Sequence, residues 1–312
     1  LYYLDHLYAL SEVIKNSGHP VVICSPDHAL FSESLNQEIT LTSFSNHSLT
    51  LHPLHFRNNE SFVGEKKIHF LLLNNDQSAP LDVDWKNLMT PVTPSPFMGW
   101  TKRQKTTHFK SYYNVAKKFC DHFDIDVDLI SAKFSEVSGV DFSSKEGIEK
   151  LANETDMLLS KLPQGNPVFL KASQGTYGMG ISVVSSGNEV REMNRKTRNK
   201  MDIGKNNLKF ESVLIQEGIE TIIKYDDMPA EVTIYLIDGK STGGFMRANP
   251  LKGTNANLNA KGMIYKKFCI SEIEQNTDHQ RKEATYSIIA RLSTLAGAYE
   301  IEQSLKEIHE TI

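Results

Sequence analysis

The sequence predicts an α/β protein with two domains, and three observations support this. The first part of the chain alternates between helical and strand patterns. A proline-rich stretch, 91–96, then interrupts the pattern as a linker would. Beyond it, two β-rich runs flank a glycine-spaced loop at 175–180. A chain of 312 residues is long enough for two hydrophobic cores. We expect an N-terminal α/β domain over 1–95 and a second, nucleotide-binding domain over 96–312.

The first domain is expected to open with a helix and continue with short strands. Leu4, Leu7 and Leu10 recur at helical spacing, and Gly18 is a suitable residue to end the helix. Because the chain begins at Leu1, inside this helix and without an initiator methionine, we expect that a further N-terminal segment precedes it. Strands are expected over 20–25, 39–44, 48–54 and 67–73, and the second and third of these are expected to form a hairpin with its turn near Asn46-His47.

A polar run, 74–76, follows the last of these strands. Residues just past a strand end are where open α/β sheets place ligand contacts. Asparagine and aspartate are also good turn formers, so a plain turn is an equal alternative.

The second domain is expected to begin with a basic helix that carries Lys105. A helix over 143–162 opens with Ser143 at a capping position and Glu146 three residues later. A cationic helix is expected over 189–201, either as a solvated face or with one or two side chains directed at a substrate. Further strands are expected over 213–216, 231–237 and 242–247, the last two joined by a turn at Asp238-Gly239.

The glycine loop is the most informative segment of the chain. Lys171 ends a β-rich run, and Gly175, Gly178 and Gly180 follow it. Glycines allow backbone N–H groups to approach an anion, and a lysine beside them adds a charge suited to phosphate. The lysine precedes the glycines and a strand follows, which excludes a Walker loop and a dinucleotide fingerprint. The loop is either a phosphate-covering flap or an ordinary hairpin turn.

Polar residues at later strand ends extend this pattern. Gln216 and Glu217 end one strand, where they could meet an adenine and a ribose. Glu231 begins the first strand of the following hairpin, and Arg247 ends the second. The loop 255–262 contains asparagines and a lysine that could hold phosphates with Mg²⁺, or that simply make a long polar loop.

Composition excludes several other classes of protein. A net charge of −4 argues against binding nucleic acid by bulk neutralisation of phosphates. No apolar run approaches the roughly 20 residues that cross a bilayer. The three cysteines are scattered and match neither a disulfide framework nor a zinc spacing, so we expect a reducing, cytoplasmic setting.

The order of these segments resembles the ATP-grasp fold, and more specifically the proteobacterial-type glutamate–cysteine ligase family. The run Gly175-Thr-Tyr-Gly-Met-Gly-Ile181 is long and specific. The other matching segments are Leu71–Asp76, Gly99-Trp100 with Arg103, Lys105 and His108-Phe109, Lys171–Gln174, Asn194–Met201, Gln216–Gly218, Gly243–Phe245 with Arg247, and Asn257–Met263.

The resemblance implies an ATP-dependent ligase. Such enzymes phosphorylate a carboxylate with ATP, and an amine then attacks the acyl phosphate. In this family the substrates would be the γ-carboxyl of glutamate and the amine of cysteine. The implied ATP contacts are Lys105, Lys171, Gly175, Thr176, Tyr177, Gly178, Gly180, Gln216 and Glu217. Arg247 and Lys171 would be catalytic, and Glu231, Asn257 and Asn259 would hold Mg²⁺.

Two alternatives to this ligase stay open at this stage. One is a truncated or non-catalytic relative that keeps only nucleotide binding. The other is an ATP-grasp ligase for a different acid and amine. We expect small-molecule partners only, with neither nucleic acid nor membrane, and the sequence does not predict the oligomeric state.

Overall fold

The computed structural model describes residues 2–31, 38–75, 77, 81–100, 102–174, 180–202, 212–254, 256–268 and 277–310. The chain forms two compact units, Leu1–Thr101 and Lys102–Ile312. The predicted domains, 1–95 and 96–312, remain a prediction. Within the described residues, no helix combines the length and the apolar character needed to cross a membrane.

The first unit contains one long helix and several short strands. Its elements are α1 (Tyr2–Asn16), β1 (Ile23–Ser25), η1 (His28–Phe31), β2 (Ile39–Thr42), β3 (Ser48–Pro53), β4 (His55–Arg57), β5 (Glu60–Val63), β6 (Lys66–Ile68), β7 (Leu71–Leu72), β8 (Val92–Thr93) and η2 (Pro96–Met98). The strands form sheets in the orders β1-β3-β2, β4-β5-β6 and β7-β8.

Several expectations for this unit are confirmed. The first helix ends before Gly18, which has a positive φ of 84°. The strands β2 and β3 pair as the expected antiparallel hairpin. The single strand expected over 67–73 is wrong, because β6 pairs with β5 whereas β7 pairs with β8. The chain therefore changes sheet at His69 and Phe70, and the Phe70 side chain is exposed.

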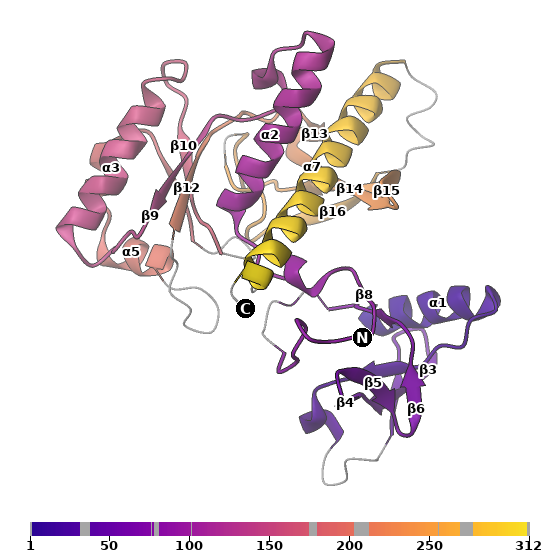
Figure 1. The fold of residues 1–312 in the computed structure, drawn as a ribbon. Helices are drawn as coiled ribbons and strands as arrows, with labels where there is room; N and C mark the ends of the chain where they lie inside the picture. The colour runs from indigo at the N-terminus through magenta and orange to yellow at the C-terminus, as the bar shows by residue number, and fades with distance from the viewer. Residues whose placement is uncertain are drawn as a thin grey trace. The chain divides into compact units, whose positions relative to one another are not determined.

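The second unit contains two sheets and several helices (Figure 1). Its elements are α2 (Lys105–Phe123), η3 (Val127–Leu129), β9 (Phe134–Ser138), α3 (Lys145–Leu159), β10 (Val168–Ala172), β11 (Ile181–Val184), α4 (Gly187–Arg191), α5 (Arg195–Asp202), β12 (Ser212–Glu217), β13 (Lys224–Tyr225), β14 (Met228–Ile237), β15 (Lys240–Ala248), β16 (Ile264–Phe268) and α7 (Thr277–Glu310).

The two sheets of this unit are antiparallel. The order of the first is β11-β10-β12-β9, and the order of the second is β13-β14-β15-β16. The predicted strand–loop–strand hairpin is confirmed, with Lys171 opposite Ile181. The predicted turn at Asp238-Gly239 is also confirmed, and both residues have the positive φ that this tight turn requires.

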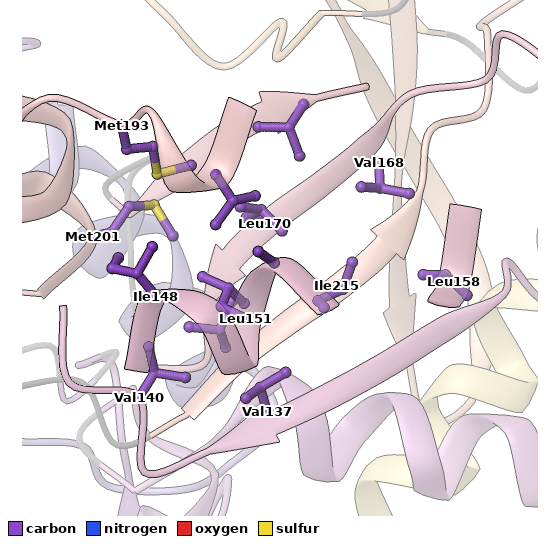
Figure 2. Close-up of a cluster of buried hydrophobic side chains, with 14 of the residues drawn as sticks. Val137, Val140, Ile148, Leu151, Leu158, Val168, Leu170, Met193, Met201 and Ile215 are labelled. Carbon is purple, nitrogen blue, oxygen red and sulfur yellow. The ribbon is translucent and has the colours of Figure 1, made fainter. Parts of the chain in front are cut away.

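The hydrophobic core of the second unit lies between α3 and one face of the first sheet (Figure 2). Successive residues of a strand point to opposite faces, so Val168 and Leu170 of β10 share the face that α3 covers. Val213 and Ile215 of β12 join them, and Leu151 of α3 packs against them. The alternate residues of β10 and β12 therefore lie on the opposite face of the sheet.

Two helix predictions in this unit were wrong in detail. The N-cap of α3 is Ser144, not Ser143, because the Ser144 hydroxyl accepts the Gly147 N–H while the Ser143 hydroxyl donates to Asp141. The single helix expected over 189–201 is two helices. Met193 is buried in the core between them, and the Asn194 side chain accepts the Thr197 N–H, which starts α5.

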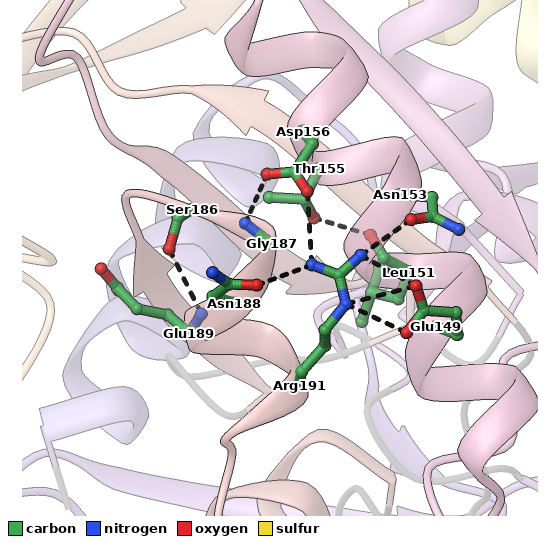
Figure 3. A network of polar contacts seen from close by, with 10 residues as sticks. All are labelled: Glu149, Leu151, Asn153, Thr155, Asp156, Ser186, Gly187, Asn188, Glu189 and Arg191. Carbon is green, nitrogen blue, oxygen red and sulfur yellow. Dashed lines mark hydrogen bonds and ion pairs between the residues drawn. The ribbon is translucent and has the colours of Figure 1, made fainter.

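Arg191 joins α4 to α3 (Figure 3). Its guanidinium lies 2.8 Å from a Glu149 oxygen and 3.4 Å from an Asp156 oxygen. Asp156 also accepts the N–H of Gly187 at 2.6 Å. Arg191, one of the cations of the predicted basic helix, is thus engaged in holding two helices together.

Replacing Gly187 by alanine is expected to destabilise the second unit. An added Cβ would lie 2.2 Å from Asp156 Oδ2 and 2.6 Å from the Ala152 carbonyl oxygen, so the helices must separate. We expect a loss of about 2 kcal/mol, or a melting temperature lower by roughly 4 °C or more. Thermal denaturation checks this. Gly253→Ala is the matched control, because its Cβ meets no atom within 4 Å. Equal melting temperatures for the two variants would contradict the prediction.

Candidate active site

The face of the first sheet opposite α3 carries Lys171 and Gln216. Lys171 alternates with the buried Leu170 and Ala172 of β10, and Gln216 lies directly across from Phe169. The Lys171 Nζ donates to Gln216 Oε1 at 2.6 Å and lies 5.4 Å from the centre of the Phe169 ring. The structure therefore brings together two of the predicted ATP-contacting residues.

Lys171 is a partly buried ammonium group. Burial lowers its pKa, and the nearby carboxylate of Glu231 opposes this by raising it. A buried cation with incomplete compensation is stabilised by an anion placed beside it. The position therefore suits a phosphate group.

Lys105 lies at the first residue of α2, next to the end of β10. Its backbone N–H donates to the Ser173 carbonyl at 3.0 Å, and its Nζ lies 3.2 Å from the Ala172 carbonyl oxygen. Thr106 adds a hydroxyl contact with Ser173 Oγ at 2.9 Å. These contacts fix the start of the helix against the strand that carries Lys171.

The charge environment of Lys105 is positive. Burial, together with the positive charges of Lys171 and Arg103, lowers the pKa of Lys105 to about 8. Since like charges repel, cations are gathered in this way where an anionic ligand compensates them. The structure thus places two of the lysines predicted to contact ATP within electrostatic range of each other.

Glu231 and Arg247 lie opposite each other on adjacent strands of the second sheet. They are register partners in β14 and β15, and Arg247 Nε lies 2.9 Å from Glu231 Oε1. The contact is an ion pair without hydrogen-bond alignment, so the buried Nε of Arg247 makes no hydrogen bond. The carboxylate of Glu231 also raises the pKa of Lys171, so this ion pair acts electrostatically on the lysine of the first sheet.

The loop with Asn257 and Asn259 is held at the end of β15. Asn249 is completely buried, and its Nδ2 lies 3.1 Å from the Leu258 carbonyl oxygen. Asn257 Oδ1 accepts the N–H of Asn259 at 3.1 Å. The loop is thereby held by Asn249, which follows Arg247 by two residues. No hydrogen bond among the described residues joins Asn257 or Asn259 to Glu231.

A site for Mg²⁺ requires oxygen ligands that lie close together. Among the described residues, no three His, Cys, Asp or Glu side chains are grouped to hold a metal ion. Magnesium in ATP-using enzymes is commonly held by one or two carboxylates together with substrate phosphates. Of the three residues predicted to hold Mg²⁺, Glu231 supplies the one carboxylate, and Asn257 and Asn259 are not hydrogen-bonded to it in the described part of the chain.

Glu217 does not share the face of Gln216. It points to the side of the sheet with Val213 and Ile215, and its Oε2 accepts the Lys133 N–H at 3.0 Å. The adjacent Gly218 is held by a 2.8 Å hydrogen bond to the Pro167 carbonyl. A contact between the Glu217 side chain and a ribose would need that side chain to turn away from Lys133.

The glycine loop is described only at its edge. Gly175, Thr176, Tyr177 and Gly178 lie outside the described residues. Gly180 has a positive φ of 64°, and its carbonyl accepts the Ala172 N–H at 2.8 Å. The end of the loop is thus paired to the strand of Lys171.

Sequence reasoning missed four residues that support the site. Ser173 and Thr106 fix Lys105, Asn249 fixes the asparagine loop, and Glu300 of α7 contacts Arg103 and His108. The Ser173–Thr106 contact and the Asn249 contacts have no periodic pattern or motif in the sequence that would predict them. Each depends on which groups the fold brings together. Glu300 lies almost two hundred positions from its partners, so only the structure reveals it.

Two antiparallel sheets, with Lys171 on one, Lys105 at the start of the adjoining helix α2 and an arginine–glutamate pair on the other, fit an ATP-using carboxylate–amine ligase of the ATP-grasp type. The chain belongs to the glutamate-cysteine ligase family, because the sequence model of that family (GshA) matches residues 1–301. The predicted fold class, family and enzyme class are confirmed.

Solved structures agree with this membership. A protein described as a gamma-glutamylcysteine synthetase from Methylobacillus flagellatus KT is 31% identical, with a TM-score of 0.76. The match covers 96% of this chain and 73% of that one. D-alanyl-alanine synthetase A from Vibrio cholerae is 12% identical with a TM-score of 0.40, over 83% of this chain and 70% of its own. No curated protein sequence matches the chain significantly.

Proposed function

We propose that this protein joins glutamate to cysteine, with ATP converted to ADP and phosphate. The observation that supports this most strongly is the placement of Lys171, which interacts electrostatically with Lys105 and with Glu231, the ion-pair partner of Arg247, in a chain of the glutamate-cysteine ligase family. An oxygen of the glutamate γ-carboxylate would attack the γ-phosphorus of ATP. The cysteine amine would then attack the resulting acyl carbon and displace phosphate.

In this proposal the residues position groups and neutralise charge. Lys105 and Lys171 would bind the phosphates, covered by the loop that contains Gly175, Thr176, Tyr177, Gly178 and Gly180. Gln216 would meet the adenine, and Glu217 the ribose if its side chain leaves Lys133. Arg247 would neutralise charge on the transferring phosphoryl group. Phosphoryl transfer depends mainly on such positioning and electrostatic stabilisation.

We further propose that Glu231, Asn257 and Asn259 hold Mg²⁺ together with the ATP phosphates. The ion would neutralise phosphate charge in addition to the lysines. The reaction uses only small molecules, and the scattered cysteines favour a reducing cytoplasm.

Measuring phosphate release from ATP and Mg²⁺, with glutamate and cysteine added singly and together, tests the proposed function. We expect rapid release only when both amino acids are present. Release with a different amine in place of cysteine would contradict the assigned substrate. ATP binding without turnover under any of these conditions would contradict the ligase activity itself.

ATP affinity is expected to fall as the pH rises through about 8. The pKa of Lys105 in the free enzyme is about 8, so above this pH the side chain loses the charge that would attract phosphate. If only the protonated lysine binds, the Kd for ATP at pH 9 should be about eightfold higher than at pH 7.5. Calorimetric titration with ATP across this range checks the prediction.

Lys105→Arg provides the matched control for this pH dependence, because arginine stays charged throughout the range. The rise in Kd between pH 7.5 and pH 9 should largely disappear in this variant. An equal rise in the variant and the wild type would assign the pH dependence to another group.

A further inference from the structure

The carboxylate of Glu300, on the C-terminal helix α7, contacts two residues at the start of α2. The side chain is only 6% exposed. Arg103 Nε donates to Glu300 Oε2 at 3.3 Å, and His108 Nδ1 hydrogen-bonds with Glu300 Oε1. The helices α2 and α7 lie side by side, as Figure 1 shows.

The three side chains form a closed cluster. A terminal nitrogen of Arg103 lies 2.8 Å from His108 Nδ1, and the other ring nitrogen of His108 lies 3.1 Å from Ser293 Oγ on α7. Burial would raise the pKa of Glu300, but the hydrogen bond with His108 and the charge of Arg103 outweigh it and lower the pKa. The buried carboxylate is therefore ionised at neutral pH, which its partners make tolerable.

Residues of this cluster lie on both sides of Lys105 in the sequence, and their contacts fix the helical turn that contains Lys105. Arg103 precedes Lys105 by two residues, and His108 follows it by three, one turn later along α2. On the other side, the backbone of Lys105 is bound to Ser173 at the end of β10. The first turn of α2 is thus held from α7 and from the first sheet.

We propose that Glu300 is a positioning residue for the nucleotide site. Through Arg103 and His108 it fixes the first turn of α2, and this holds the Lys105 ammonium beside Lys171 for the ATP phosphates. Glu300 itself contacts no substrate. The inference rests on the proposed role of Lys105 in ATP binding. A charged group aids binding most when its position is set before the ligand arrives.

A double-mutant cycle on ATP affinity tests this inference. The variants are Glu300→Gln, Lys105→Met and the double variant, each titrated with ATP in a calorimeter. We expect Glu300→Gln alone to raise the Kd at least fivefold. In the Lys105→Met background the same change should raise the Kd less than twofold, because the side chain that Glu300 positions is absent.

Glu302→Gln is the matched control on the same helix. Glu302 is exposed and pairs with Lys306, so its loss should leave the Kd within twofold of wild type. If Glu300 only stabilised the fold in general, its replacement would raise the Kd for ATP by the same factor in the wild type and in the Lys105→Met background.

Two results would overturn the inference while leaving the proposed function intact. One is an unchanged Kd in Glu300→Gln, and the other is an equal effect of that change with and without Lys105. If Glu300→Gln does not fold, the same cycle is run with His108→Gln. We expect this change to raise the Kd for ATP more in the wild type than in the Lys105→Met background. An equal rise in both backgrounds would contradict the inference. A wild-type protein that binds no ATP would overturn the proposed function itself.

Discussion

Replacing Lys171 by alanine is expected to lower kcat/KM for ATP at least a hundredfold. The ammonium is partly buried beside Gln216 and close to Lys105, where the phosphates are proposed to bind. Removing one charged donor from such a preorganised site typically costs a factor of 10² to 10³. The rate of phosphate release with saturating glutamate and cysteine, measured against ATP concentration, checks this.

Lys118→Ala is the control for that experiment, because Lys118 is exposed on α2. It should retain the wild-type kcat/KM, and both variants should keep the wild-type melting temperature within a few degrees. Full activity in a folded Lys171→Ala protein would remove Lys171 from the site.

Arg247→Ala is expected to lower kcat by about 10² to 10³ while the Kd for ATP changes less than tenfold. The guanidinium is proposed to stabilise charge that develops during phosphoryl transfer, which affects the transition state more than the bound substrate. Its loss also leaves Glu231 without its ion-pair partner, so a negative charge would stand uncompensated near the phosphates. Single-turnover kinetics, combined with calorimetric ATP binding, separate the two quantities.

Arg247→Lys and Lys240→Ala are the controls for this prediction. Arg247→Lys keeps the charge and should recover part of the lost rate. Lys240 is exposed at the start of the same strand, so its loss should leave kcat unchanged. A Kd that rises as much as kcat falls would assign Arg247 to ground-state binding instead.

Local sequence signals predicted the parts of the fold that depend on local chemistry. The strand pairing across the glycine loop and the hairpin at Asp238-Gly239 were predicted correctly, and at the second the two turn residues specify the backbone conformation. The strand that bears Gln216 was also predicted, because its apolar run is bounded by polar residues and glycine.

Features set by tertiary pairing were beyond the sequence signals. The break between β6 and β7 arises because the two strands have different partners, and an apolar run does not encode the partner. The break between α4 and α5 follows from the burial of Met193 and the new cap at Asn194. The basic residues on which the prediction of a single helix rested indicate neither this burial nor this cap.

The candidate site was predictable in its residue types but not in its orientation. Lys171 was expected from the motif and Lys105 from the family resemblance, and in the structure the charge of Lys171 acts on Lys105. Gln216 and Glu217 were expected to act side by side, yet adjacent residues of a strand point to opposite faces, so only Gln216 joins Lys171. Glu300 acts on Arg103 and His108 from a helix far away in sequence.

The most direct test of the proposed chemistry follows an oxygen atom from glutamate to phosphate. The enzyme is supplied with ATP, Mg²⁺, cysteine and glutamate labelled with ¹⁸O in its γ-carboxyl group, and the released phosphate is analysed by mass spectrometry. If the carboxylate attacks ATP and the amine then displaces phosphate, each phosphate carries one labelled oxygen. Unlabelled phosphate, formed while γ-glutamylcysteine accumulates, would contradict activation of glutamate as an acyl phosphate.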